Sequence, residues 1–183
     1  DFSDFEAFLE AVNDDRRFEQ QIDDYLDVDA FLRALAMGFL IGNSDDYRFN
    51  YNNYYLYFDV YTQKVTYIPF DLDSSLGFGK HIDMSGNYGI DYGLLQYSEQ
   101  AILVDKLLKI DRYKEIYLTY LKTFAETLFD ETAFEAEYLQ AKALYEPVLI
   151  LDNHLGNQRF DLRNSITYIE DKKNFVLAQF SSN

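Results

Sequence analysis

The sequence predicts an α+β fold that is mostly helical and contains one β-hairpin. Apolar residues recur with helical spacing before residue 42 and again from residue 94 almost to the end, as in amphipathic helices. Between these regions, 54–60 and 64–70 are rich in aromatic and β-branched residues and are separated by a short turn segment, which is typical of a hairpin. The chain has 183 residues, of which 48% are apolar, so we expect residues 1–183 to form one domain or one lobe of a larger one.

The N-terminal third is predicted to contain two helices. Ser3 and Glu6 have the spacing of a capping box, and four apolar residues after Ser3 lie on one helical face: Phe5, Phe8, Leu9 and Val12. The acid-rich stretch 13–24 is expected to be a connector that is partly helical. Asp29 is then expected to cap a second helix over 30–41, which should be buried because it has little polar surface.

Gly42 is expected to end the second helix and to begin a polar loop, 43–53, which leads into the hairpin. Asp71 follows the second strand at once. Residues 74–93 contain five glycines without a repeat and are predicted to be a loop.

The C-terminal half is predicted to be a helical subdomain, 94–180. Apolar spacing indicates helices around residues 102–108 and 113–128, and a final helix over 162–180. Between them, Thr132 and Glu135 have capping-box spacing and are expected to open a further helix. Pro147 is expected to kink or end that helix.

Composition excludes several classes of function. The chain has no Cys and only two His, which rules out disulfide scaffolds and Cys-ligated metal sites and leaves oxygen-ligand metal chemistry. Its 16 basic and 32 acidic residues give a formal charge of −16, which argues against nucleic-acid or anionic-membrane binding, since phosphate contacts need Lys and Arg. No apolar run approaches the roughly 20 residues needed to span a bilayer.

The segment 42–77 concentrates the residues that could carry chemistry. Carboxylates and amides precede the hairpin, and two further carboxylates follow it. The candidates are Asn43, Asp45, Asp46, Asn50, Asn52, Asn53, Asp71 and Asp73. Mg²⁺ prefers such hard oxygen ligands, and it usually takes one or two carboxylates together with phosphates and water. Kinases place a catalytic Asp before a metal-binding Asn and, further on, a metal-binding Asp, which is the order found here.

Each feature of this segment also has a simpler interpretation. Asp45 and Asp46 could be turn residues, and Asp71 and Asp73 could cap a turn or form a structural Ca²⁺ site. The hairpin tyrosines could stack on sugars or bases, although packing of an amphipathic sheet is the commoner reason for such a pattern. His81 and His154 lack acidic or hydroxyl partners at telling spacing, so we do not expect them to be catalytic.

Three motifs within this segment, in this order, resemble a known family. They are GNSDDY, NNYYLY and IPFDLDSSLGF. Together they resemble the core of the CotH kinase family, the spore coat protein H family of atypical protein kinases, with Phe70 where the family more often has Trp. The similarity extends to the helix before Gly42 and to the C-terminal helices, so it covers nearly the whole chain.

The resemblance implies a role for each matching residue. Asp45 matches the catalytic acid, Asn53 matches the Asn before the aromatic strand with Asn52 as its competitor, and Asp71 matches the metal-binding acid. Asp73 belongs to the same motif and is a further candidate metal ligand. The implied cofactors are ATP and Mg²⁺ or Mn²⁺, and the implied substrate is a Ser-containing protein. The implied location is extracellular, at the cell surface or in a spore coat.

The family's upstream half has no counterpart in this sequence. No Gly-rich loop and no Lys precede Asp45, whereas a kinase needs a cation on the nucleotide phosphates. We therefore expect residues 1–183 to be the C-terminal lobe of a CotH-like domain, inactive alone, and to work with the N-terminal lobe of the same protein. The alternative is a non-enzymatic surface, adhesion or cellulosome-associated binding module that retains the fold.

Overall fold

A computed structural model describes residues 2–77, 90, 101–149 and 163–181. Its elements are α1 (Ser3–Asn13), α2 (Phe18–Tyr25), α3 (Val28–Ile41), β1 (Tyr54–Asp59), β2 (Lys64–Pro69), α4 (Ile102–Leu108), α5 (Asp111–Thr127), α6 (Glu131–Leu149) and α7 (Arg163–Ser181). The predicted α+β class, mostly helical with one antiparallel hairpin, is confirmed. The predicted loop 74–93 is described only to Gly77 and at Ile90, and both histidines lie outside the described residues.

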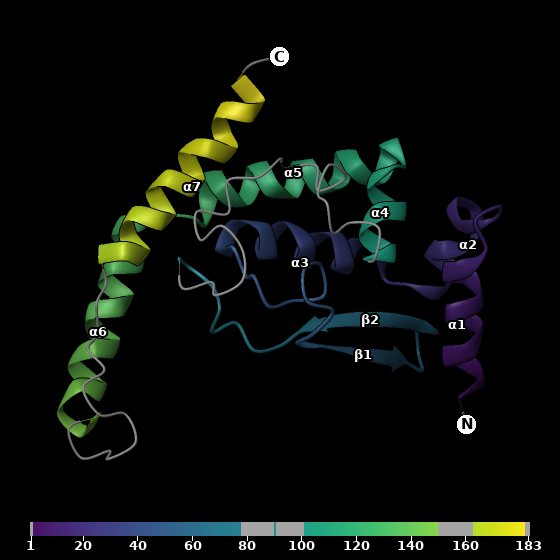
Figure 1. Cartoon of the computed structure of the whole chain (residues 1–183), viewed down its shortest axis with the longest axis horizontal. Coiled ribbons are helices and arrows are strands. Elements are labelled where there is room, and N and C mark those ends of the chain that lie inside the picture. Colours follow the sequence, from purple (N-terminus) through teal and green to yellow (C-terminus); the bar gives the residue numbers. More distant parts are fainter. Residues whose placement is uncertain (1, 78–89, 91–100, 150–162, 182–183) are drawn as a thin grey trace.

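Helix α3 is the central element of the fold. It lies between α5 on one side and the hairpin on the other, while α1 and α2 lie at one end and α6 and α7 at the other (Figure 1). Helix α5 packs on α3 through a stripe of residues spaced four apart, which are Tyr113, Tyr117, Leu121 and Ala125. The loop that follows α3 is therefore attached to the most buried helix of the molecule.

The burial predicted for α3 is confirmed. Its seven buried residues are Val28, Phe31, Leu32, Leu35, Ala36, Phe39 and Leu40. The prediction that Asp29 caps the helix was wrong, because Asp27 is the N-cap and accepts a hydrogen bond from the amide of Ala30 at 3.0 Å. Asp29 instead lies in the first turn, where its carboxylate accepts hydrogen bonds from the Tyr120 hydroxyl and the Arg33 guanidinium.

The two predicted capping boxes were also wrong in detail. Helix α1 begins at Ser3, and its N-cap is Phe2, which makes no side-chain cap. Helix α6 begins at Glu131, where the carboxylate of Asp130 accepts from the amide of Ala133 at 2.9 Å. The connector 13–24 does prove partly helical, since it contains most of α2. Pro147 lies in the last described turn of α6.

The hairpin has one face toward the core and one toward solvent. Its register pairs Leu56 with Tyr67 and Phe58 with Val65 on the inner face, and Tyr55 with Ile68 on the outer face. The amide of Asp27 donates to the carbonyl of Val65 at 2.9 Å, which ties β2 to the start of α3. The predicted amphipathic packing therefore accounts for the inner residues, whereas the outer tyrosines remain exposed.

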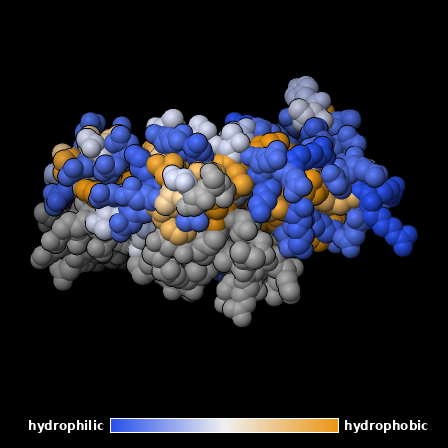
Figure 2. All heavy atoms as spheres, turned by 90° about the horizontal axis from the view of Figure 1, so that it is seen from above, coloured by the Kyte–Doolittle hydropathy of each residue, from blue (hydrophilic) through white to orange (hydrophobic). Residues whose placement is uncertain are grey.

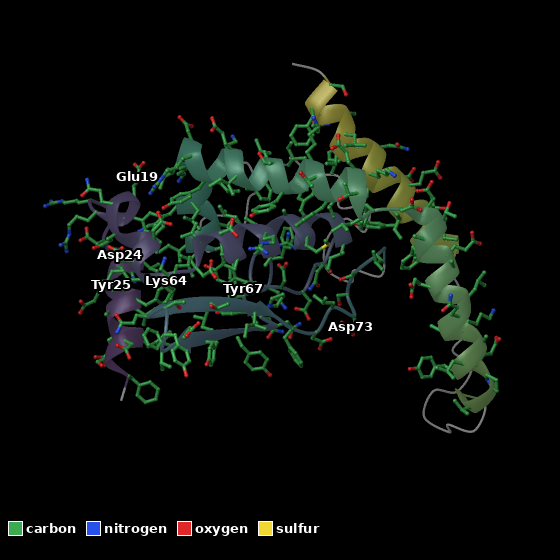
Figure 3. The ribbon with its side chains drawn as sticks, turned by 180° about the vertical axis from the view of Figure 1, so that it is seen from behind. Glu19, Asp24, Tyr25, Lys64, Tyr67 and Asp73 are labelled. Carbon is green, nitrogen blue, oxygen red and sulfur yellow. The ribbon has the colours of Figure 1, made fainter. Side chains whose placement is uncertain are left out.

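Tyrosines of the loop and hairpin form an aromatic cluster beneath α3. Tyr67 points from β2 toward α3 (Figure 3), and its ring centroid lies 5.3 Å from that of Phe31 and 5.6 Å from that of Tyr54. Tyr47 packs on both tyrosines, and its hydroxyl accepts from the amide of Leu103 at 3.1 Å. Burial raises the pKa of Tyr47 to about 12 and also raises the pKa of Tyr67.

The raised pKa values of these tyrosines predict that the fold loses stability in strong alkali. The folded state keeps Tyr47 protonated above the unfolded-state pKa of 10, so its contribution is complete below pH 10 and disappears as the pH rises to about 12. We expect the free energy of unfolding to fall by up to about 3 kcal/mol from this residue, measured by urea unfolding at successive pH values. Tyr47→Phe should flatten the curve, and Tyr61→Phe, at a 94% exposed position, should not. Equal curves for both variants would contradict this assignment.

Candidate active site

The turn at Gly42 brings the two halves of the 42–77 segment together. Gly42 ends α3 in the left-handed conformation, with φ of 64°, as helix C-termini often require. The amide of Ser44 donates to the carbonyl of Ser74 at 3.2 Å, and the amide of Leu76 donates to the carbonyl of Ile41 at 2.7 Å. The segment that leaves the hairpin therefore runs beside the loop that enters it. The candidate residues before the hairpin and those after it thus lie on neighbouring segments of the chain.

The carboxylate of Asp45 is held by two side-chain amides. Nδ2 of Asn50 donates to one carboxylate oxygen at 2.5 Å, and Nδ2 of Asn53 donates to the other at 3.0 Å and to the Asp45 carbonyl at 2.8 Å. Because these partners only accept, each Asn must turn its NH₂ group toward Asp45. The structure thus joins three of the predicted residues through direct side-chain contacts.

Asn53 also connects this group to Asp71. The amide of Phe70 donates to the carbonyl of Asn53 at 2.9 Å, and Asp71 is the next residue of the chain. Both Asn53 and Asp71 have positive φ values, 56° and 49°, which are costly for residues other than glycine and persist only where the surrounding structure imposes them. Asn53 directly precedes β1 and Asp71 follows β2, so both lie at the open end of the hairpin. Such strain is an observation that points to a functional site.

Asp46 and Asn43 lie on the buried side of the loop. Asp46 forms a buried ion pair with Arg48, whose Nε donates to its carboxylate at 2.5 Å. Asn43 is 1% exposed, and its Oδ1 accepts from the amide of Asp45 at 3.0 Å. Both side chains therefore lie on the side of the loop that faces α3, where both also line a pocket.

The remaining candidates lie on the solvent side. Asn52, Asp71 and Asp73 are exposed, and the hydroxyl of Ser74 donates to the carboxylate of Asp73 at 3.2 Å. Asp73 lies beyond the open end of the hairpin, at the opposite end from Lys64 (Figure 3). Among the described residues, no group of three or more acidic or histidine side chains is placed to hold a metal ion. A metal here would need Asn oxygens, phosphates or water as further ligands, which suits Mg²⁺.

Arg48 lies in the candidate site and was not among the residues predicted from the sequence. Its guanidinium, 4% exposed, also donates to the carbonyls of Asn43 and Leu35, at 3.2 and 3.5 Å. In the sequence, Arg48 stands out because no other Lys or Arg occurs between Arg33 and Lys64, in a segment that is otherwise acidic and polar. An exposed base would be expected there, and only the tertiary contacts show that this one is buried.

Comparison with known proteins identifies the family. A family model described as "CotH kinase protein" matches residues 1–176. The chain belongs to the CotH kinase family. The family resemblance predicted from the three motifs is therefore confirmed, and its extent over nearly the whole chain agrees with the range matched by the CotH model.

A curated relative in the CotH family comes from a fungus. The chain is 31% identical over 145 residues to "Invasin CotH7" of Rhizopus delemar. The matched region is 77% of this chain and 23% of the relative, so this CotH chain spans less than a quarter of that protein.

The described part of the CotH chain has a largely hydrophilic surface on one face. Among the coloured residues seen from above, hydrophilic ones predominate and hydrophobic ones form patches between them (Figure 2). Within the described residues, no helix combines the length and apolar character that a membrane crossing requires.

Proposed function

We propose that the protein containing this chain transfers the γ-phosphate of ATP to a serine hydroxyl of a protein substrate. Asp45 is the catalytic residue, and Asn53 and Asp71 hold Mg²⁺ or Mn²⁺. The observation that carries the proposal is the linkage of these residues: the Asn53 side chain binds Asp45, and the Asn53 carbonyl binds the residue before Asp71. Membership in the CotH kinase family supports the same reaction class.

Asp45 suits the role of proton acceptor for the attacking hydroxyl. Its carboxylate is only partly buried, so a substrate can approach it. The bonds from Asn50 and Asn53 orient the carboxylate, and a carboxylate oxygen is the group that accepts the serine proton. As the serine oxygen attacks the γ-phosphorus, this proton passes to Asp45 and ADP leaves.

Asn53 and Asp71 suit the role of metal ligands. Because Nδ2 of Asn53 faces Asp45, its Oδ1 can bind another partner. Asp71 is exposed and directly follows Phe70, whose amide binds the Asn53 carbonyl. Bound Mg²⁺ would neutralise charge on the phosphates. Asp73 is an additional ligand candidate. Asn50 also orients Asp45, and Asn53 is preferred as the metal ligand because its carbonyl binds the amide of the residue before Asp71.

The proposal assigns phosphate binding to residues outside this segment. A kinase needs a cation on the α- and β-phosphates, and the sequence has no Lys before Asp45. We propose that the N-terminal lobe of the intact protein supplies it, and that the chain alone binds metal without turning over ATP. A surface or extracellular location is part of the proposal, since the fungal relative is named an invasin.

The test is metal-dependent transfer of the γ-phosphate of ATP to a serine-rich peptide, or to the protein itself, by the intact protein. We expect Asp45→Ala to lower the rate about 100-fold and Asp71→Ala to raise the Mg²⁺ concentration needed for half-maximal activity. Asp24→Ala is the control, because Asp24 is an exposed acid at the far end of the molecule (Figure 3). Unchanged activity in both site variants would refute the site assignment.

A second candidate function is a non-enzymatic binding module on a cell surface. The outer face of the hairpin exposes large apolar side chains, with Tyr55 57%, Tyr57 56% and Phe70 51% accessible, and exposed aromatic residues are enriched at binding surfaces. The relative's name also favours a surface role. Isothermal titration of the intact protein with Mg·ATP separates the two functions, because this alternative predicts no heat of binding.

A further inference from the structure

We infer that Arg48 is a positioning residue that sets the orientation of Asp45 from the buried side of the loop. The inference rests on the proposed function for its catalytic consequence, and on the contacts of Arg48 for its structural basis. Arg48 contacts the chain on both sides of Asp45. Its guanidinium binds the carbonyl of Asn43, two residues before Asp45, at 3.2 Å, and its Nε and amide bind the carboxylate of Asp46, the next residue, at 2.5 and 2.9 Å.

The same guanidinium anchors the loop to helix α3. It donates to the carbonyl of Leu35 at 3.5 Å and lies against the ring of Phe49, with Cζ 5.1 Å from the ring centroid. Asp45 is therefore held from two sides. Arg48 holds Asn43 and Asp46 against the core, and Asn50 and Asn53 bind the Asp45 carboxylate. A shift of Arg48 should move the carboxylate relative to its amide partners.

Gly38 provides the space that Arg48 occupies. A Cβ atom at this position would lie 3.0 Å from Nη2, 3.1 Å from Cζ and 3.3 Å from Nη1 of Arg48. Glycine is less favourable than alanine inside a helix, so its presence in the middle of α3 needs a packing reason, and the guanidinium supplies one. Gly38→Ala should displace Arg48 by a few tenths of an ångström while improving the intrinsic helix propensity of α3.

Gly38→Ala should therefore disturb the position of Arg48 with little effect on the stability of the fold, which separates a positioning role from a general structural one. For Gly38→Ala we expect a melting temperature within about 4 °C of wild type. We also expect amide hydrogen exchange in residues 43–53 to be about tenfold faster, because the displaced Arg48 holds the loop less tightly. In the intact protein, kcat should fall about tenfold while KM for ATP changes less than about twofold, since misplaced catalytic groups lower the rate.

A double-mutant cycle identifies Arg48 as the group that responds. Arg48→Lys retains a charge for Asp46 but lacks the planar guanidinium. The Cβ atom that Gly38→Ala adds then meets fewer side-chain atoms at residue 48. The effect of Gly38→Ala on loop exchange should therefore be smaller in the Arg48→Lys background. Arg33→Ala, which removes an exposed guanidinium from the same helix, should leave loop exchange unchanged.

Loop hydrogen exchange and kcat test different parts of the inference. Unchanged loop exchange in Gly38→Ala, or an equal effect in the Arg48→Lys background, would overturn the positioning role. Faster loop exchange together with unchanged kcat in an active intact protein would overturn its catalytic consequence. Faster loop exchange in a protein whose wild type transfers no phosphate would support the anchoring by Arg48 and refute the kinase proposal instead.

Discussion

Arg48→Ala is expected to lower the free energy of unfolding by about 3–5 kcal/mol, the usual cost of breaking a buried ion pair by removing one partner. The Arg48 and Asp46 side chains are only 4% and 10% exposed, so the remaining carboxylate would be left as an uncompensated buried charge. The carbonyls of Asn43 and Leu35 would lose a donor as well. Urea unfolding, with the slope as well as the midpoint recorded, measures the loss.

Arg17→Ala is the matched control for this prediction. It also removes an arginine from an ion pair with an aspartate, Asp14, but the Arg17 side chain is 70% exposed. Solvent screens such pairs, so we expect a much smaller loss than for Arg48→Ala. Removing both charges in the Asp46→Ala, Arg48→Ala double variant should cost less than the sum of the single changes. Equal losses for Arg48→Ala and Arg17→Ala would show that the buried pair contributes little.

Gly42→Ala is expected to destabilise the fold by about 2–5 kcal/mol, for two independent reasons. Gly42 has a φ of 64°, where an L side chain is strained. An added Cβ would also overlap the Tyr168 hydroxyl and lie 2.9 Å from its Cζ. Because that hydroxyl donates to the carbonyl of Leu40 at 3.0 Å, relieving the overlap would disturb the contact between α7 and the end of α3.

Tyr168→Phe separates the two contributions. This change removes the hydroxyl and leaves the ring, so Gly42→Ala should cost at least about 1 kcal/mol less in the Phe background than in wild type. The remaining cost measures the backbone strain together with the residual ring contact. Strict additivity of the two changes would mean that the Tyr168 overlap is relieved without cost. Thermal or urea unfolding of the four proteins provides the cycle.

Much of the fold could be predicted because its signals are local. The buried character of α3, its end at Gly42 and the positions of both strands follow from the period of apolar residues and from turn chemistry. The predicted helix caps failed at Asp29 and Thr132 because several acidic or hydroxyl residues precede each helix. Which of them becomes the cap depends on where packing sets the first turn. Asp27 is selected at α3 because its amide also binds β2.

The candidate site was predicted as a set of residues but not as an arrangement. The sequence left Asn50, Asn52 and Asn53 as alternative metal ligands. In the structure the side-chain amides of Asn50 and Asn53 bind Asp45, which only the tertiary arrangement shows. Asp45 and Asp46 are neighbours with the same side chain, yet one faces the loop amides and the other a buried guanidinium. No local pattern predicts this division, because it depends on which side of the loop faces α3.

The sequence by itself determined the class of fold, the family and the segment in which we propose the site, because apolar periodicity and motif order are properties of the chain. Only the tertiary structure decided that Arg48 is buried, that Gly38 and Gly42 are needed for space, and that Asp46 belongs to the interior. These outcomes depend on contacts between residues that are distant in sequence, such as Gly42 with Tyr168 and Leu35 with Arg48.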